Sequence, residues 1–233
     1  MSTPAPPEPG TESRSEKRHR SAQEYVTAVV AMCADTGTRA DLRSGLGRPL
    51  EQCARMHRWL AWRVPQDSFG ERAHYAVASL IADRPRAVRE AQAARAATEP
   101  ANAPGTGSAT VTEPAPLQPV PWHHRPNLGT GLGQAVLAGM KEGSAESHLR
   151  LLTRQGFISV HPRLPSLLRY VQDKGTEVDW AVLLEDLSAW DLARDAIATR
   201  WLQSFYRTLH APRPGSDTPA DAQSSRTEES ETR

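Results

Sequence analysis

Apolar residues recur at helical spacing along much of the chain, most clearly near its C-terminal end. One set repeats at i, i+3, i+4, i+7 and i+10 and therefore shares one helix face: Trp180, Leu183, Leu184, Leu187 and Trp190. Asp179 can cap this helix, and a second helix is expected to begin at Asp191. The second helix continues the buried stripe through Ala193, Ile197, Trp201 and Phe205. The pattern predicts a helical hairpin within a hydrophobic core.

The same spacing predicts helices in the rest of the chain. In the first half they cover 22–34, 39–45, a segment that starts at Pro49, and 72–83. The helix over 72–83 has few polar positions, which is typical of a central element in a bundle. In the second half, Ser144 caps one helix and His161-Pro162-Arg163 opens another. These elements predict an all-α protein.

Composition divides the chain into two foldable parts. Polar and Pro-rich segments at 1–20 and 211–233 predict disordered tails. Residues 91–126 pass from an Ala/Arg run into closely spaced prolines and predict a Pro/Ala-rich linker. The remaining ranges, 21–90 and 127–210, are each near the lower size limit for an independent core. We therefore expect two small helical bundles that pack together and support one another.

Charge and cysteine usage narrow the class of protein. The formal net charge is only +1, but the acidic C-terminal tail leaves the rest of the chain mildly basic, and all but three of the Lys and Arg residues are arginine. No apolar run is long enough to span a membrane and no signal peptide is evident, so we expect a cytoplasmic protein without membrane association. Cys33 and Cys53 lie on separate predicted helices and are expected to be buried free thiols.

A search for catalytic and ligand-binding patterns favours a protein that is not an enzyme. The glycine-rich run 127–134 follows no predicted strand and lacks the lysine of a phosphate-binding loop. Glu185 and Asp186 are neighbours on a helix, so their side chains point about 100° apart and suit solvated helix surface better than a two-carboxylate site. His123 and His124 lack the further ligands of a metal site. We expect neither a metal nor a cofactor.

Several segments, taken in order, resemble the small subunit of the type I-E CRISPR surveillance complex Cascade, a family also called CasB. The segments are 35–43, 75–82, 132–136, 146–152, and 178–206 with its Asp-Trp pair and spaced tryptophans. The resemblance covers about residues 21–210 apart from the linker. It implies an all-helical, non-enzymatic subunit present in two copies, with the other Cascade subunits, crRNA and target DNA as partners.

The family role implied by the resemblance is to steady the R-loop through sequence-independent contacts to the target or displaced DNA strand. Arg43, Arg154 and Arg169 match basic positions of the family, whereas Ser44, Ser147 and His148 stand where many members have basic residues. Seven residues are expected to contact phosphates: Arg43, Arg72, Lys141, Arg150, Arg154, Arg163 and Arg169.

Two other interpretations remain open. The arginine-rich faces suit a helical scaffold or adaptor subunit that makes protein contacts only, because arginine is also enriched at protein interfaces. A small enzyme that uses His148 or His161 together with Glu146 would need a pocket that the sequence does not indicate. Binding to single-stranded DNA at low salt distinguishes the first interpretation from nucleic-acid binding.

Overall fold

Several helices of this protein begin where a short polar side chain satisfies free backbone N–H groups. Asp35 accepts from the N–H of Thr38 at 2.6 Å, and Asp67 accepts from the N–H of Gly70 at 2.6 Å. Asp179 accepts from the first-turn N–H groups that follow it at 3.0 and 3.1 Å, as the sequence predicted. The boundaries of these helices therefore follow from local capping chemistry.

The computed structural model describes residues 13–98, 122–176 and 178–211, and within them all regular structure is helical, which confirms the all-α prediction. The α-helices are α1 (Arg14–Met32), α2 (Thr36–Arg43), α3 (Ala54–Leu60), α4 (Ser68–Ala82), α5 (Arg86–Thr98), α6 (Leu128–Leu137), α7 (Glu142–Thr153), α8 (Phe157–Val160), α9 (Leu164–Asp173), α10 (Trp180–Ser188) and α11 (Trp190–His210). Short 3-10 turns lie at Leu50–Gln52 (η1), Trp122–His124 (η2) and His161–Arg163 (η3).

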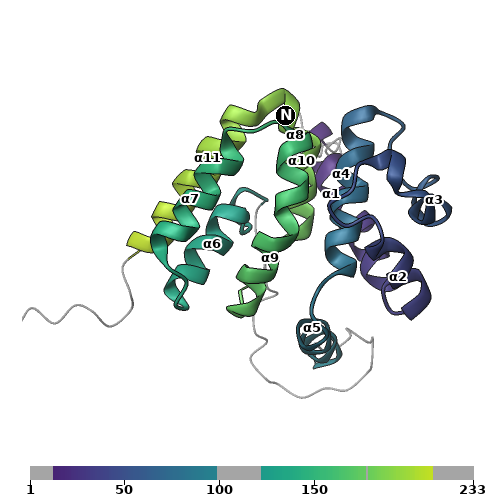
Figure 1. Ribbon diagram of the computed structural model, residues 1–233, viewed down its shortest axis with the longest axis horizontal. Coiled ribbons are helices and arrows are strands. Elements are labelled where there is room, and N and C mark those ends of the chain that lie inside the picture. The colour runs from purple at the N-terminus through teal and green to yellow at the C-terminus, as the bar shows by residue number, and fades with distance from the viewer. Residues whose placement is uncertain (1–12, 99–121, 177, 212–233) are drawn as a thin grey trace, which may run out of the picture.

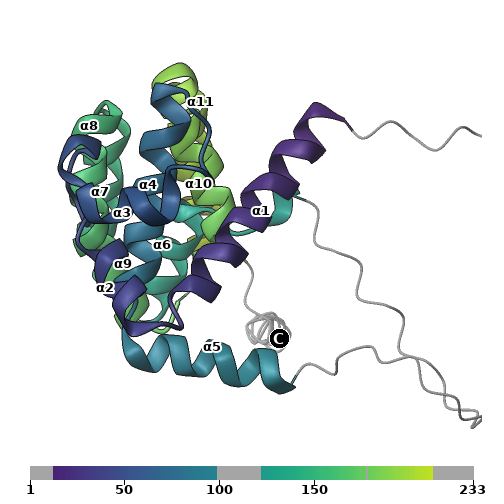
Figure 2. The same cartoon turned by 90° about the vertical axis from the view of Figure 1, so that its right-hand side faces the viewer.

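The helices form two groups that share one continuous hydrophobic core. Figure 1 shows α6, α7 and α11 on one side and α1 to α4 on the other, with α9 and α10 between them. α10 comes late in the chain, yet it packs against α1 and α4. In the view turned by 90°, α5 is seen to lie across one end of the molecule (Figure 2). The two parts of the chain therefore support one another, as expected from their small size.

The predicted tryptophan hairpin forms and fills the core. Trp190 and Trp201 are fully buried, with ring centroids 4.8 Å apart, and Trp190 Nε1 donates to the carbonyl oxygen of Gln155 at 2.9 Å. The expectation that Ala193 is buried was wrong, because the backbone leaves helical geometry there (φ −134°, ψ 25°) and the residue is exposed. α11 is thus kinked within its first turns, and the buried stripe resumes at Ile197.

Three predicted boundaries also need correction. α7 begins at Glu142 with Lys141 as its N-cap, so Ser144 lies within its first turn and does not cap it. α1 begins at Arg14 rather than at 22, within the range predicted as a tail, because Ser13 and Glu16 form a reciprocal capping box. α5 continues to Thr98, into the range predicted as linker, because alanine and arginine favour helix. Of the predicted tails at 1–20 and 211–233 and the predicted linker at 91–126, the parts at 1–12, 212–233 and 99–121 lie outside the described residues.

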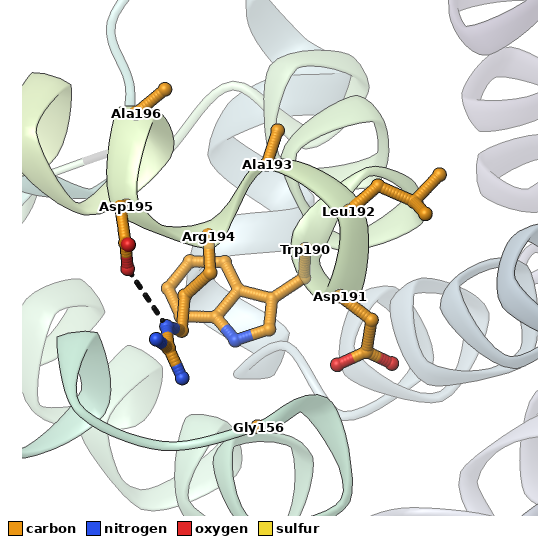
Figure 3. A pocket seen from close by; sticks show the side chains of 8 residues that line it. All are labelled: Gly156, Trp190, Asp191, Leu192, Ala193, Arg194, Asp195 and Ala196. Carbon is orange, nitrogen blue, oxygen red and sulfur yellow. Dashed lines mark hydrogen bonds and ion pairs between the residues drawn. The ribbon is translucent and has the colours of Figure 1, made fainter.

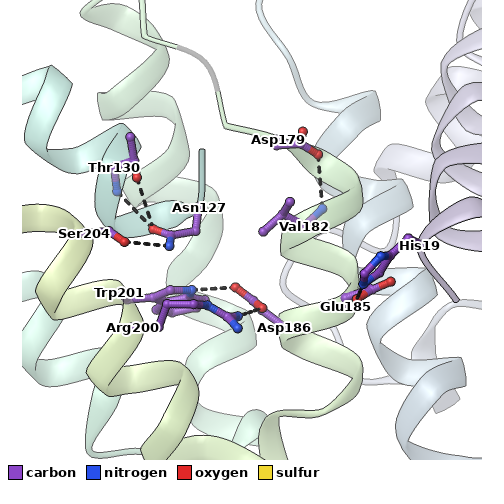
Figure 4. Close-up of polar contacts among 10 residues, drawn as sticks. All are labelled: His19, Asn127, Thr130, Asp179, Val182, Glu185, Asp186, Arg200, Trp201 and Ser204. Atoms are coloured by element: carbon purple, nitrogen blue, oxygen red, sulfur yellow. Dashed lines mark hydrogen bonds and ion pairs between the residues drawn. The ribbon is translucent and has the colours of Figure 1, made fainter. Parts of the chain in front are cut away.

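The glycine-rich run that resembles a phosphate loop is a helix with a packing function. Gly129 and Gly133 face α11, and a Cβ atom built on Gly129 would lie 1.9 Å from the carbonyl oxygen of Trp201. At Gly133 a Cβ atom would lie 2.7 Å from Thr208 Cβ. Glycine is therefore required because the α6 and α11 backbones approach so closely. Asn127 caps α6 and also donates to Ser204 Oγ at 2.9 Å (Figure 4).

Candidate nucleic-acid interface

Two of the predicted basic residues meet on one buried carboxylate. Arg43, the last residue of α2, donates through Nε to Asp83 Oδ1 at 2.7 Å. Arg169 of α9 donates to both oxygens of Asp83, at 2.6 and 2.8 Å. The Asp83 side chain is only 4% exposed, whereas Arg43 and Arg169 are 59% and 49% exposed. Residues 126 positions apart in the sequence therefore present one fixed pair of guanidinium groups to solvent.

Asp83 occupies a position where a carboxylate is unfavourable without a cation. It is the C-cap of α4, and the partial negative charge at a helix C-terminus repels an acidic side chain. The two guanidinium groups offset this repulsion and raise the local net charge to +1. Ion pairing with Asp83 also raises the pKa of Arg169. Planar guanidinium groups held in this way suit contacts to phosphate oxygens.

A second basic group surrounds a hollow between η1 and η3. Arg72 of α4 and Arg48 line it, together with Pro162. Arg163 follows Pro162 directly, is exposed, and donates to the carbonyl oxygen of Ser159 at 2.7 Å. Arg163 is the N-cap of α9 and Arg169 lies within the same helix, so α9 carries one residue of each group.

The remaining predicted residues lie on α7. Arg150 pairs with Glu146 at 2.7 Å, and Glu146 in turn accepts from the hydroxyl of Tyr206 at 2.5 Å. Lys141 and Arg154 are exposed at the two ends of α7, about 20 Å apart at the helical rise per residue. In Figure 1, α7 and α2 lie at opposite sides of the molecule. The three predicted residues of α7 are therefore separate from the pair on Asp83, and the seven residues do not form one surface.

The prediction that Glu185 and Asp186 lie on solvated helix surface was wrong. Asp186 is buried, accepts from Trp201 Nε1 at 2.6 Å and pairs with Arg200 (Figure 4). Burial raises the pKa of Asp186, while Arg200 and the indole N–H counteract that rise. The carboxylate therefore ties α10 to α11 within the core.

Glu185 is also largely buried and lies beside α1. Its Oε2 atom is 3.4 Å from His19 Nε2, and its Oε1 atom has no hydrogen-bond partner among the described residues. Burial raises the pKa of Glu185 to about 7, and burial followed by the nearby charges of Arg18 and Arg125 lowers the pKa of His19. Both shifts favour neutral side chains, so the contact is not a strong ion pair at pH 7 although its geometry resembles one.

This burial makes stability depend on pH. Glu185 binds its proton more tightly in the folded state than in the unfolded state. The resulting contribution to the free energy of unfolding is fully present below about pH 4.5 and is lost as the pH rises through 7. We expect Glu185→Gln to raise the free energy of unfolding at pH 8 by about 1 to 2 kcal/mol and to change it little at pH 5. Urea denaturation at both pH values measures this difference.

The same titratable and charged groups surround position 185 in the wild-type protein and in Glu185→Gln: His19, Arg18, Arg125, Asp186 and Arg200. Their titration therefore contributes to the unfolding free energy of both proteins and does not account for the difference between them. The matched control is Glu24→Gln, because the Glu24 side chain is 70% exposed. A gain at pH 8 that is equal for the two variants contradicts the assignment to Glu185.

Within the described ranges, no group of three or more His, Cys, Asp and Glu side chains is placed to hold a metal ion, and no helix is both long and apolar enough to cross a membrane. Cys33 and Cys53 are buried free thiols, as predicted, and burial raises the pKa of both. The sequence predicted no metal site at His123 and His124, and the side chain of His123 lies outside the described part of the chain.

Sequence reasoning missed Arg48 and Asp83. Arg48 carries no periodic signal, because it lies in the loop between α2 and η1. Asp83 offered one signal: an acidic residue directly after a long apolar helix indicates a cationic partner, because the helix dipole disfavours it. Its two partners come from α2 and α9, which local sequence does not reveal.

Comparison with known families decides the identity of the fold. A family model described as CRISPR-associated protein Cse2 matches residues 38–206, which is well over half of the chain. The chain belongs to the Cse2 family. The CasB resemblance that the sequence motifs indicated is thereby confirmed. A search of curated proteins gave no match.

Solved structures agree with membership of the Cse2 family. A chain from a structure titled "CRISPR RNA-guided surveillance complex" is 31% identical, with a TM-score of 0.65 over 82% of this chain and 95% of that one. A chain from the pre-nicking form of such a complex is also 31% identical, with a TM-score of 0.66 over 82% and 94%. The crystal structure of M. ruber CasB is 20% identical over 85% and 96%, with a TM-score of 0.55, and shows the shared fold.

Proposed function

We propose that this chain is a non-catalytic small subunit of a CRISPR RNA-guided DNA surveillance complex that steadies the R-loop through sequence-independent backbone contacts. The partners are the other subunits of that complex, its crRNA and the target DNA, and two copies of the chain act in each complex. Membership of the Cse2 family and the likeness to chains of such complexes support this proposal. A cytoplasmic location follows from these partners.

The observation that carries the proposal is the pair of arginines on Asp83. Arg43 and Arg169 are oriented by the buried carboxylate, yet about half of each side chain remains open to solvent. Their remaining N–H groups are available to phosphate oxygens, and a preorganised guanidinium loses little conformational entropy when it binds. Arg163 and Arg72 continue this basic surface toward the hollow at η3.

A salt titration tests the proposal. If about four basic side chains neutralise phosphates at once, the logarithm of the association constant for single-stranded DNA should fall with a slope near −3 against the logarithm of salt concentration. Filter binding of the full chain to a labelled single strand measures this slope. A flat response contradicts backbone binding.

A second candidate function is a scaffold that makes protein contacts only, and two exposed apolar side chains favour it. Leu192 is 78% exposed at the α11 kink, where it points away from the buried Trp190 ring (Figure 3), and Trp62 is 71% exposed beyond α3. A contiguous exposed apolar patch marks a docking surface, and in a scaffold Leu192 and Trp62 would be anchor points of such patches. Protein that co-purifies with large subunits but ignores single-stranded DNA at low salt would favour the scaffold.

A further inference from the structure

A hollow of about 220 Å³ lies between the two groups of helices, beside the arginines described above. Its apolar wall comes from Leu50 and Tyr75 on one side and from Phe157, Ile158 and Pro162 on the other. Arg48, Arg72 and Glu51 contribute charged groups to the same hollow. An apolar recess with a few charged groups is the usual form of a small-ligand site.

The hollow is held open by a loop with little freedom. Gly47 has a φ of +68°, which favours glycine, and a Cβ atom built on it would lie 3.7 Å from Pro162 Cα and 3.9 Å from Pro165 Cγ. A Cβ atom on Gly45 would lie 2.2 Å from Met56 Sδ. Tyr75 is fixed by a 2.8 Å hydrogen bond between its hydroxyl and His57 Nδ1. The recess is therefore preformed, which lowers the entropic cost of binding.

The lining includes aromatic surface and a buried polar group that the fold leaves unsatisfied. His161 lines the hollow and stacks against Phe157, with ring centroids 5.8 Å apart and planes at 8°. His161 is only 7% exposed, and its Nε2 atom has no hydrogen-bond partner within the described residues. Burial lowers the pKa of His161, so the ring is a neutral donor and acceptor at pH 7.

The charges around the hollow favour an anionic ligand with a planar apolar part. Arg48 and Arg72 outweigh Glu51, and Arg163 follows the lining residue Pro162 directly. Beyond it, α9 leads to Arg169 on Asp83. A polyanionic strand that follows these arginines therefore passes the mouth of the recess.

We propose that this hollow binds one unstacked nucleobase of a single strand, while Arg48 and Arg72 hold the adjoining phosphates. The inference rests on the proposed function and deepens it, because it adds a base-accepting subsite to a surface otherwise expected to contact only the backbone. The apolar and aromatic wall accepts any base, so the subsite confers no sequence specificity.

Two single strands of equal length and charge separate base binding from backbone binding. One is oligothymidylate, and the other carries abasic residues at every internal position. In fluorescence anisotropy at fixed salt, the full chain should bind oligothymidylate at least about five-fold more tightly, the lower end of the gain from one stacked base. Ile158→Ala should bring this ratio close to one and leave affinity for the abasic strand unchanged.

Ile158 suits this test because it is 74% exposed, so its truncation removes part of one wall of the hollow without leaving a core cavity. Leu192→Ala is the matched control, since Leu192 is 78% exposed and lines a different hollow at the α11 kink. This control should keep the ratio of the wild-type protein.

Equal affinity of the wild-type protein for both strands overturns the base subsite, and the proposed function then still stands if both affinities depend steeply on salt. Failure to bind either strand overturns both proposals. Equal affinities together with poorer recovery of partner subunits by Ile158→Ala identify the hollow as a docking site for a protein side chain, and also overturn the inference.

Discussion

Gly129→Ala should strongly destabilise the fold, lowering the free energy of unfolding by about 3 kcal/mol or more. The added methyl group would lie 1.9 Å from the carbonyl oxygen of Trp201, and this backbone atom cannot rotate away as a side chain does. α6 and α11 would have to separate, which would loosen the packing around Trp201 and Phe205. Urea denaturation followed by tryptophan fluorescence measures the loss.

Gly143→Ala is the matched control for this prediction. Gly143 lies in the first turn of α7, and a Cβ atom there meets nothing within 4 Å. Alanine favours helix over glycine, so this variant should be as stable as the wild-type protein or up to about 1 kcal/mol more stable. Equal effects of the two substitutions would show that close helix packing is not the reason for Gly129.

The paired substitution Arg43→Gln with Arg169→Gln should have the largest effect on nucleic-acid binding. It removes both guanidinium groups from Asp83, and with them two expected phosphate contacts. The salt slope should then fall from about −3 to about −1.5, and affinity for single-stranded DNA at moderate salt should fall by about ten-fold or more. Filter binding of both proteins over the same salt range measures this change.

A control with the same change of charge separates local contacts from net charge. Arg194 and Arg207 are exposed on α11, and their joint replacement by glutamine also removes two positive charges. Circular dichroism of each variant shows whether the fold is retained. If the α11 variant loses as much affinity as the Arg43 and Arg169 variant, the arginine pair on Asp83 has no special role.

Local pattern predicted most of the helices and the buried tryptophans, because both depend on spacing and capping within a few residues. It gave no helix for α6, whose glycines are explained only by their contact with α11. Pattern could not predict the kink at Ala193, where the helix leaves regular geometry although the apolar stripe continues. It also misplaced Asp186, because a lone acidic residue on a helix is usually solvated and its partners, Arg200 and Trp201, come from the next helix.

The candidate interface was predicted residue by residue but not as a surface. Arg43 and Arg169 were both expected to contact phosphates, yet their meeting point on Asp83 depends on how α2, α4 and α9 pack. Arg150 was also expected to contact phosphate, but it is ion-paired with Glu146 on α7, at the opposite side of the molecule from α2. Helical periodicity shows which side of a helix faces solvent, whereas tertiary packing decides which exposed charges become neighbours.

The position of α10 has a consequence for biosynthesis. α1 and α4 are translated early, but the helix that covers their apolar faces begins only at Trp180. The nascent chain therefore carries uncovered apolar surface until α10 has left the ribosome, and native contacts of this kind span long sequence separations. A prematurely terminated product that ends before α10 would be a substrate for chaperones and proteases rather than a usable half of the subunit.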